Sequence, residues 1–142
     1  MRIEIEAEPS AEIRELIDRG LDIFNEAKAG VTEYRDLWVI ARDDGSEPRA
    51  GLKARTFYGW MFIDWLWVSP EARGSGVGSA LLAAAEAEAR DRGCSGAFLD
   101  TYSFQAPEFY EKNGYERFGR IDDFPPGHAC IWLKKRFKTA GS

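Results

Sequence analysis

The sequence predicts an α/β fold with one mixed sheet of about seven strands and flanking helices, built as a single domain over residues 1–142. Short apolar stretches of strand length alternate with longer stretches of helical periodicity. The chain has the length of one domain, and its 44% hydrophobic and 30% charged residues are typical of a globular protein. The expected order is β-α-β-β-β-α-β-α-β-β.

The N-terminal third predicts one strand, one helix and two further strands. Arg2–Glu8 alternates like a strand, and Ser10 is a candidate N-cap for a helix that ends at Gly30. Leu37–Ala41 is a short apolar run, and the alternation of residues 50–55 indicates a half-buried strand.

The central run Met61–Val68 is nearly all apolar, and only Asp64 interrupts it. Because Gly59 and Pro70 bound it, we expect a central strand that is buried on both faces. Counting along the strand, Asp64 shares a face with Leu66 and Val68. The remaining elements are expected to be a helix at Val77–Arg92, a strand at Ala97–Tyr102, a helix at Pro107–Lys112, and strands at Tyr115–Ile121 and Ala129–Phe137.

Composition excludes several classes of function. The net charge of −5 does not suggest nucleic-acid binding, although it is compatible with a cationic substrate. No segment approaches the roughly 18 apolar residues of a membrane span, and the N-terminus lacks the apolar core of a signal peptide. Cys94 and Cys130 match no disulfide framework or zinc motif. We therefore expect a cytoplasmic protein with free thiols, no metal and no membrane partner.

The glycine-rich segment that follows the central strand predicts an anion site. Between Arg73 and Ser79, three glycines lead into a helix N-terminus, where backbone N–H groups and the helix dipole favour a pyrophosphate. A P-loop is excluded because no lysine follows Gly78. A dinucleotide-binding fold would use Asp100 for a ribose, but the third glycine of its motif is missing and only 42 residues follow Asp100.

Two motifs resemble the GNAT superfamily of acyl-CoA N-acyltransferases. The spacing Arg73-x-x-Gly76-x-Gly78 is similar to the Q/R-x-x-G-x-G/A motif of that family. The block from Ser103 to Tyr115 is similar to N-x-x-A-x-x-x-Y-E-K-x-G-F/Y, with Ser103 where Asn is common. The resemblance implies a GNAT-like fold that uses acetyl-CoA as donor.

The resemblance also implies which residues bind the donor. Val68 would offer main-chain groups to the pantetheine and acetyl end, where the strands that carry Val68 and Asp100 splay apart. Ser103 and Lys112, from the second motif, join the expected donor site. The pyrophosphate would lie against the backbone of Arg73, Gly74, Ser75, Gly76, Val77 and Gly78 and against Ser79.

The chemistry needs an acid for the leaving thiolate and a base for the amine. Tyr110 occupies the tyrosine position of the family motif and is the candidate acid; packing on the sheet is its alternative role. Two residues are candidate bases. Asp64 is a carboxylate in an apolar strand that could instead be paired with an arginine, and His128 follows a rigid Pro-Pro-Gly turn.

The sequence thus predicts an N-acetyltransferase that acts on the primary amine of a small molecule by direct attack in a ternary complex. Dense aromatic residues could line the acceptor pocket, or form core and a homodimer surface. A protein or peptide N-acetyltransferase, a non-catalytic CoA-binding module and a nucleotide-binding regulatory domain are the alternatives.

Overall fold

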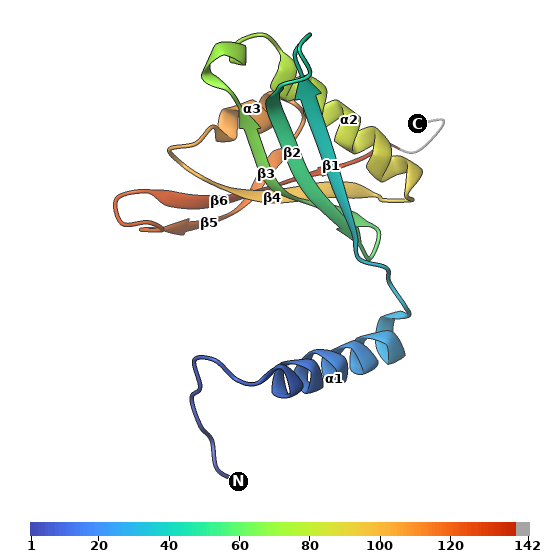
Figure 1. The fold of residues 1–142 in the computed structure, drawn as a ribbon. Coiled ribbons are helices and arrows are strands. Elements are labelled where there is room, and N and C mark those ends of the chain that lie inside the picture. Colours follow the sequence, from blue (N-terminus) through green and yellow to red (C-terminus); the bar gives the residue numbers. More distant parts are fainter. Residues whose placement is uncertain (139–142) are drawn as a thin grey trace. The chain divides into compact units, whose positions relative to one another are not determined.

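The structure, a computed structural model, describes residues 1–138 (Figure 1). The chain forms two compact units, Met1–Thr32 and Glu33–Ser142. The first unit holds one helix, α1 (Ala11–Ala29). The described part of the second holds six strands, two α-helices and a short 3₁₀ helix, Pro70–Ala72.

The first unit begins with residues that form no strand. The strand expected at Arg2–Glu8 is therefore wrong, and the described residues contain six strands rather than about seven. Alternation alone does not make a strand, because its backbone groups need a neighbouring strand to pair with. Helix α1 begins as expected, since the Ser10 side chain accepts a hydrogen bond from the Ile13 amide at 3.3 Å. It ends at Gly30, whose φ is +84°.

The second unit is built on one mixed sheet with the strand order β1-β2-β3-β4-β6-β5. All neighbouring strands are antiparallel except β3 and β4, which are parallel. The boundaries lie close to the expected ones. The strands are β1 (Arg35–Arg42), β2 (Pro48–Phe57), β3 (Trp60–Val68), β4 (Gly96–Tyr102), β5 (Glu116–Asp122) and β6 (Ala129–Arg136).

The core lies between one face of this sheet and helix α2 (Val77–Asp91), which packs against β1, β2, β3 and β4 (Figure 1). Leu82 from α2 and Leu52, Met61 and Leu99 from the sheet are almost completely buried there. A second short helix, α3 (Pro107–Lys112), follows β4. These contacts fix the start of α2 relative to the ends of β3 and β4.

Strand β3 differs from the prediction in two respects. It is buried on one face only, since Trp65 and Trp67 on the other face are 64% and 53% exposed. Its register with β2 shifts, because Lys53 pairs with Trp65 whereas Ala54 pairs with Ile63. Asp64 is the extra residue of this bulge, and a bulge reverses the alternation of side chains beyond it.

The bulge changes the face on which the residues after Asp64 lie, whereas Asp64 itself stays on the face of Phe62. Leu66 packs against the buried core, as does Val68, whereas the Asp64 side chain bonds to Lys53 on the opposite face. The expectation that Asp64 shares a face with Leu66 and Val68 is therefore wrong. Simple counting along the sequence cannot detect one inserted residue.

A buried polar network ties α2 to the C-terminal half of the sheet. Glu86 of α2 is 5% exposed and accepts hydrogen bonds from the Tyr115 hydroxyl and the Lys135 ammonium, both at 2.8 Å. Lys135 also donates to the Asn113 carbonyl at 2.9 Å. Burial, and then the charge of Glu86, raise the pKa of Tyr115 well above its usual value, so its hydroxyl remains a donor.

We expect Tyr115→Phe to lower the free energy of unfolding by about 2 kcal/mol, because a hydrogen bond to a buried charged acceptor is lost. Tyr34→Phe is the control, since Tyr34 is exposed and should change stability by less than about 0.5 kcal/mol. Urea denaturation measures both. Equal stability of the two variants would contradict a stabilising role for the network.

Candidate functional site

The site begins where β3 and β4 stop pairing. These parallel strands are paired over three residue pairs only, from Trp60–Gly96 to Phe62–Phe98. Each strand continues to pair with its other neighbour, so that Leu66 still faces Leu52 of β2 and Asp100 still faces Trp132 of β6. The splay expected between the strands that carry Val68 and Asp100 is therefore present.

A pocket of ≈ 830 Å³ lies at this splay. One part of it is lined by residues 72–74 and 76–79 and by residues around α3, and the rest is lined by β3 and β4. Leu66 and Val68 reach it from the core face of β3, whereas Trp65 and Trp67 reach it from the opposite face. The pocket therefore connects the two faces of the sheet and can bring two reactants together from opposite sides.

The glycine loop offers open backbone to this pocket. Gly74 and Gly76 have φ of +78° and +85°, a region that side chains rarely adopt. A Cβ atom built on either glycine would meet no atom within 4 Å. Gly76 is the N-cap of α2, so the N–H groups of Val77, Gly78 and Ser79 lie in the first turn, where a helix leaves them unpaired. Together they form a suitable cradle for an anion.

Several hydrogen bonds hold the loop in this shape. The Arg73 Nε donates to the Val68 carbonyl at 3.2 Å, which folds the arginine back over the end of β3. The Ser75 hydroxyl donates to the Ala72 carbonyl. Ser79 accepts a hydrogen bond from the Asn113 amide at 3.3 Å, which links the start of α2 to the end of α3. These bonds fix the loop against β3 and α3.

The expected donor-binding residues do not all line the pocket. Ser75 does not line it, and neither does Lys112, which is exposed at the end of α3. Ser103 lies outside the lining as well, because its hydroxyl accepts a hydrogen bond from the Ala129 amide at 2.9 Å. The expected residues that do line the pocket are Val68, Arg73, Gly74, Gly76, Val77, Gly78 and Ser79.

Tyr110 of α3 also lines the pocket and is 8% exposed. Its ring packs edge-on against Phe109 and Tyr115, with centroid distances of 5.1 and 5.9 Å. Burial raises the pKa of Tyr110 to about 12. Within residues 1–138 its hydroxyl has no hydrogen-bond partner, although it is not sealed off from the pocket. Tyr110 is therefore protonated near neutral pH and can donate a hydrogen bond to a ligand.

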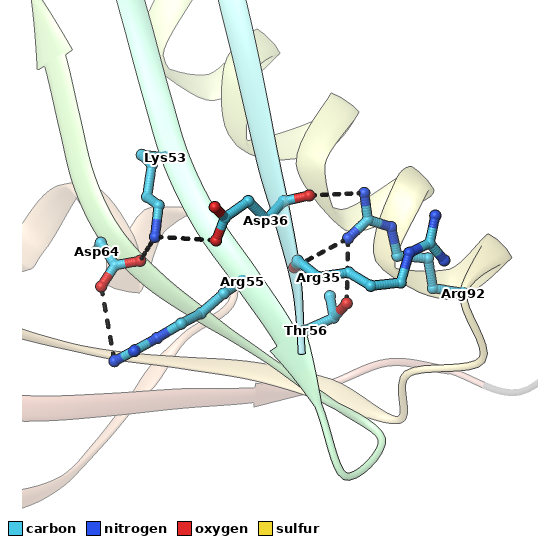
Figure 2. A network of polar contacts seen from close by, with 7 residues as sticks. All are labelled: Arg35, Asp36, Lys53, Arg55, Thr56, Asp64 and Arg92. Carbon is cyan, nitrogen blue, oxygen red and sulfur yellow. Dashed lines mark hydrogen bonds and ion pairs between the residues drawn. The ribbon is translucent and has the colours of Figure 1, made fainter. Parts of the chain in front are cut away.

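Asp64 lines the pocket too, but its charge is already balanced. Figure 2 shows its carboxylate between Lys53, at 2.8 Å, and Arg55, at 3.8 Å. Lys53 also lies 3.4 Å from Asp36 on β1. The pairing with a neighbouring arginine that the sequence left open is therefore present, with a lysine as the closer partner.

His128 stands apart from the pocket lining. It is exposed just before β6, and its ring lies edge-on to the Phe104 ring, with 4.9 Å between the ring centroids. Phe104 itself lines the pocket. The structure therefore brings Tyr110 and Asp64 into one pocket and places His128 behind one of its aromatic walls.

Asp100 and Gln105 are pocket residues that the sequence analysis did not assign to the site. Asp100 on β4 is exposed, lines the pocket and forms no ion pair within residues 1–138. The Gln105 carbonyl accepts hydrogen bonds from the Thr101 hydroxyl at 2.8 Å and the Tyr102 amide at 2.9 Å. The alternation of β4 could have placed Asp100 on the face of Phe98, but the pocket itself depends on the splay.

Among residues 1–138, no three His, Cys, Asp or Glu side chains are grouped so as to hold a metal ion. No helix in the same range has the length and apolarity needed to cross a bilayer.

Comparison with known proteins yields a consistent set of relatives. The sequence model of the acetyltransferase (GNAT) family matches residues 3–115. An acetyltransferase of Agrobacterium fabrum is 38% identical over 127 residues, covering 89% of this chain and 93% of that protein. The blasticidin-S acetyltransferase of Streptomyces morookaense is 44% identical over 109 residues, covering 74% and 80%. An acetyltransferase crystal structure from Bacillus cereus has a TM-score of 0.85 at 29% identity, covering 94% and 98%.

The Asp64–Lys53 ion pair should make the free energy of unfolding fall as the pH rises into the alkaline range. The hydrogen bond to Asp64 raises the pKa of Lys53, and burial opposes that shift. A raised lysine pKa stabilises the fold below the unfolded value of about 10.4, and this contribution is lost as the pH rises through the folded value. We expect the difference in unfolding free energy between wild type and Lys53→Met to be constant from about pH 6 to 9 and to shrink above about 10.4.

Urea denaturation across this pH range measures that difference, and Lys134→Met is the control because Lys134 is exposed and forms no ion pair within residues 1–138. A Lys53→Met difference that stays constant to about pH 12 would contradict the ion pair as the cause.

Proposed function

The chain belongs to the GNAT family of acetyltransferases, and we propose that it transfers an acetyl group from acetyl-CoA to the primary amine of a small molecule by direct attack in a ternary complex. One observation carries the proposal. A single pocket joins the glycine loop, the Tyr110 hydroxyl and the gap between β3 and β4. Its residues thus provide an anion cradle, an acid and an approach from the opposite face of the sheet.

The pocket suits acetyl-CoA as the donor. The backbone N–H groups of the loop and of the first turn of α2 would hold the pyrophosphate, because no side chain fills the space above Gly74 and Gly76. The volume of ≈ 830 Å³ lies within the range of small-molecule sites. Val68 would border the acetyl end, and Arg73 would keep the Val68 carbonyl in place. Ser75, Ser103 and Lys112 remain proposed donor contacts from the family motifs.

Tyr110 would act on the leaving thiolate. A CoA thiol resembles a cysteine, with a pKa of about 8.5. With its pKa raised to about 12, Tyr110 is a weaker acid than the thiol by several pKa units, so complete proton transfer to a free thiolate costs roughly 5 kcal/mol. Tyr110 would therefore stabilise the developing charge as a hydrogen-bond donor and transfer its proton late, while the C–S bond breaks.

The general base is proposed from two sequence candidates. Asp64 lines the pocket, but its carboxylate is already paired with Lys53 and Arg55. His128 carries no such pair within residues 1–138, but it would act through a water because Phe104 provides the wall on its side of the pocket.

The relatives support a small-molecule acceptor. Blasticidin-S acetyltransferase carries a small-molecule substrate in its name, and it is 44% identical to this chain. A peptide acceptor is the second candidate, favoured by the exposed face that carries Trp65 and Trp67. The lining position of Tyr110 argues against a non-catalytic CoA-binding module.

The family model spans residues of both compact units, which supports one acetyltransferase domain over residues 1–142. Cys94 and Cys130 are buried free thiols, as suits a reducing cytoplasm. A homodimer remains a proposal from the exposed aromatic residues of the sheet.

We expect Gly76→Leu to abolish the rise in melting temperature that acetyl-CoA causes in the wild type, because a side chain would occupy the pyrophosphate space. Gly93→Leu is the matched control. Gly93 has the same φ of +85° and the same open surroundings, but lies just after the other end of α2. Both variants should lose about 1–2 kcal/mol from backbone strain. An unchanged acetyl-CoA shift in folded Gly76→Leu would contradict the loop assignment.

We expect Tyr110→Phe to keep the affinity for acetyl-CoA and to lower kcat by about 10²- to 10⁴-fold, since the hydroxyl acts as thiolate charge develops. The variant should fold normally, because the hydroxyl has no partner to lose within residues 1–138. Steady-state rates and calorimetry with acetyl-CoA measure the two effects, and Tyr34→Phe is the control. Wild-type kcat, with chemistry rate-limiting, would reassign Tyr110 to packing.

A further inference from the structure

We propose that Asp100 binds the ammonium group of a cationic aromatic amine and takes its proton, with Trp65 and Trp67 as the platform for the aromatic ring. The inference rests on the proposed function and names the acceptor class and the base for the same pocket.

The register of the sheet places Asp100 at the gap through which the pocket passes. The last pair between β3 and β4 joins Phe62 and Phe98, whose rings lie 5.0 Å apart. Asp100 is two residues beyond Phe98 and therefore on the same face. That face of β3 carries the exposed tryptophans, and Asp100, Trp65 and Trp67 all line the pocket. Asp100 thus faces the reaction from the side opposite the core.

Asp100 differs from Asp64 in having no ion-pair partner within residues 1–138. Asp64 is held by Lys53 and Arg55, as Figure 2 shows. Asp100 has no cationic partner within residues 1–138, and its one polar contact there is the Cys130 thiol at 4.0 Å. Burial and the charge of Asp100 raise the pKa of Cys130. A neutral thiol carries no positive charge, so the negative charge of Asp100 has no counter-ion within residues 1–138. An ammonium group would balance it.

The tryptophans indicate the rest of the acceptor. Two large aromatic rings, 64% and 53% exposed, flank the pocket, and Trp38 extends the surface because its ring lies 5.9 Å from that of Trp65. Aromatic faces attract cations and stack on flat rings. A carboxylate next to such faces selects a molecule with both a positive charge and a planar group.

The proposed transfer balances in atoms and charge. The acceptor R–NH₃⁺ gives one proton to the Asp100 carboxylate, which frees the nitrogen lone pair. That pair forms the C–N bond to the thioester carbon, while the C–S bond breaks and its electron pair stays on sulfur. Sulfur takes the hydroxyl proton of Tyr110, and Tyr110 regains the proton that nitrogen loses on becoming an amide. Asp100 releases its proton to water, so the products are the acetamide, CoA thiol and H⁺.

The test compares three acceptors of similar shape at pH 7 by following thiol release from acetyl-CoA. Benzylamine is cationic and aromatic, cyclohexylmethylamine is cationic but not aromatic, and aniline is aromatic but neutral. We expect wild type to prefer benzylamine. Asp100→Asn should lower kcat/KM for the two cationic amines by at least about 10²-fold, with most of the loss in kcat, and change aniline by less than about threefold.

Further variants test the tryptophan platform and control for the loss of a carboxylate elsewhere on the sheet. Trp65→Ala and Trp67→Ala should reduce kcat/KM for benzylamine about fivefold more than for cyclohexylmethylamine. Asp36→Asn is the control, because Asp36 is an exposed carboxylate outside the pocket, and it should change no rate by more than about twofold. Calorimetry should give the same acetyl-CoA affinity for Asp100→Asn and wild type.

The outcomes distinguish this inference from the proposed function. Equal effects of Asp100→Asn on benzylamine and aniline would overturn it, as would selective loss of the cationic amines in Asp64→Asn or His128→Ala but not in Asp100→Asn. Transfer by wild type to none of the three amines, with acetyl-CoA still bound, would also overturn it while leaving the donor site intact. Absence of acetyl-CoA binding by wild type would instead refute the proposed function.

Discussion

The early end of pairing between β3 and β4 is the constraint on which the site depends. After the pair Phe62–Phe98, the two parallel strands separate, although each remains bonded to its other neighbour. A continuous ladder would close the sheet and leave no passage between its faces. Beyond that pair the backbone groups of β3 and β4 do not bond to each other, and polar backbone groups need partners. A ligand that lies between the strands can supply them.

The rest of the second unit holds the splayed strands in place. Strand β2 bonds to β3 on one side of the gap, and β6 bonds to β4 on the other. Helix α2 packs across β1 to β4, and Glu86 anchors it to Tyr115 and Lys135 beyond the gap. Asn113 joins the end of α3 to the start of α2. The glycine loop and Tyr110 therefore keep fixed positions relative to the gap.

The sequence predicted the elements of this unit well, because periodicity, glycines and prolines are local signals. The alternation of charged and apolar residues at Arg2–Glu8 predicted a strand that is not formed. A strand needs a neighbouring strand to pair with, and the local sequence does not show whether one is present. Alternation also failed at Asp64, where one bulged residue reverses the faces of β3. The glycine loop and Tyr110 were located from motifs and do line one pocket. Asp100 was assigned no role in the reaction, because its importance depends on a splay and on charges brought from other strands.

The contrast between Asp64 and Asp100 shows how the fold gives one residue type two different roles. Asp64 lies on the face of the sheet opposite the core, where Lys53 and Arg55 form ion pairs with it. Asp100 lies on β4, where the residue paired with it on β6 is Trp132. It has no cationic partner within residues 1–138. A carboxylate that is already paired has its counter-ion, whereas an unpaired one can still attract an ammonium group. The first aspartate thus takes part in ion pairs of the sheet, and the second has no cationic partner within residues 1–138, which the proposed binding of a cationic amine requires.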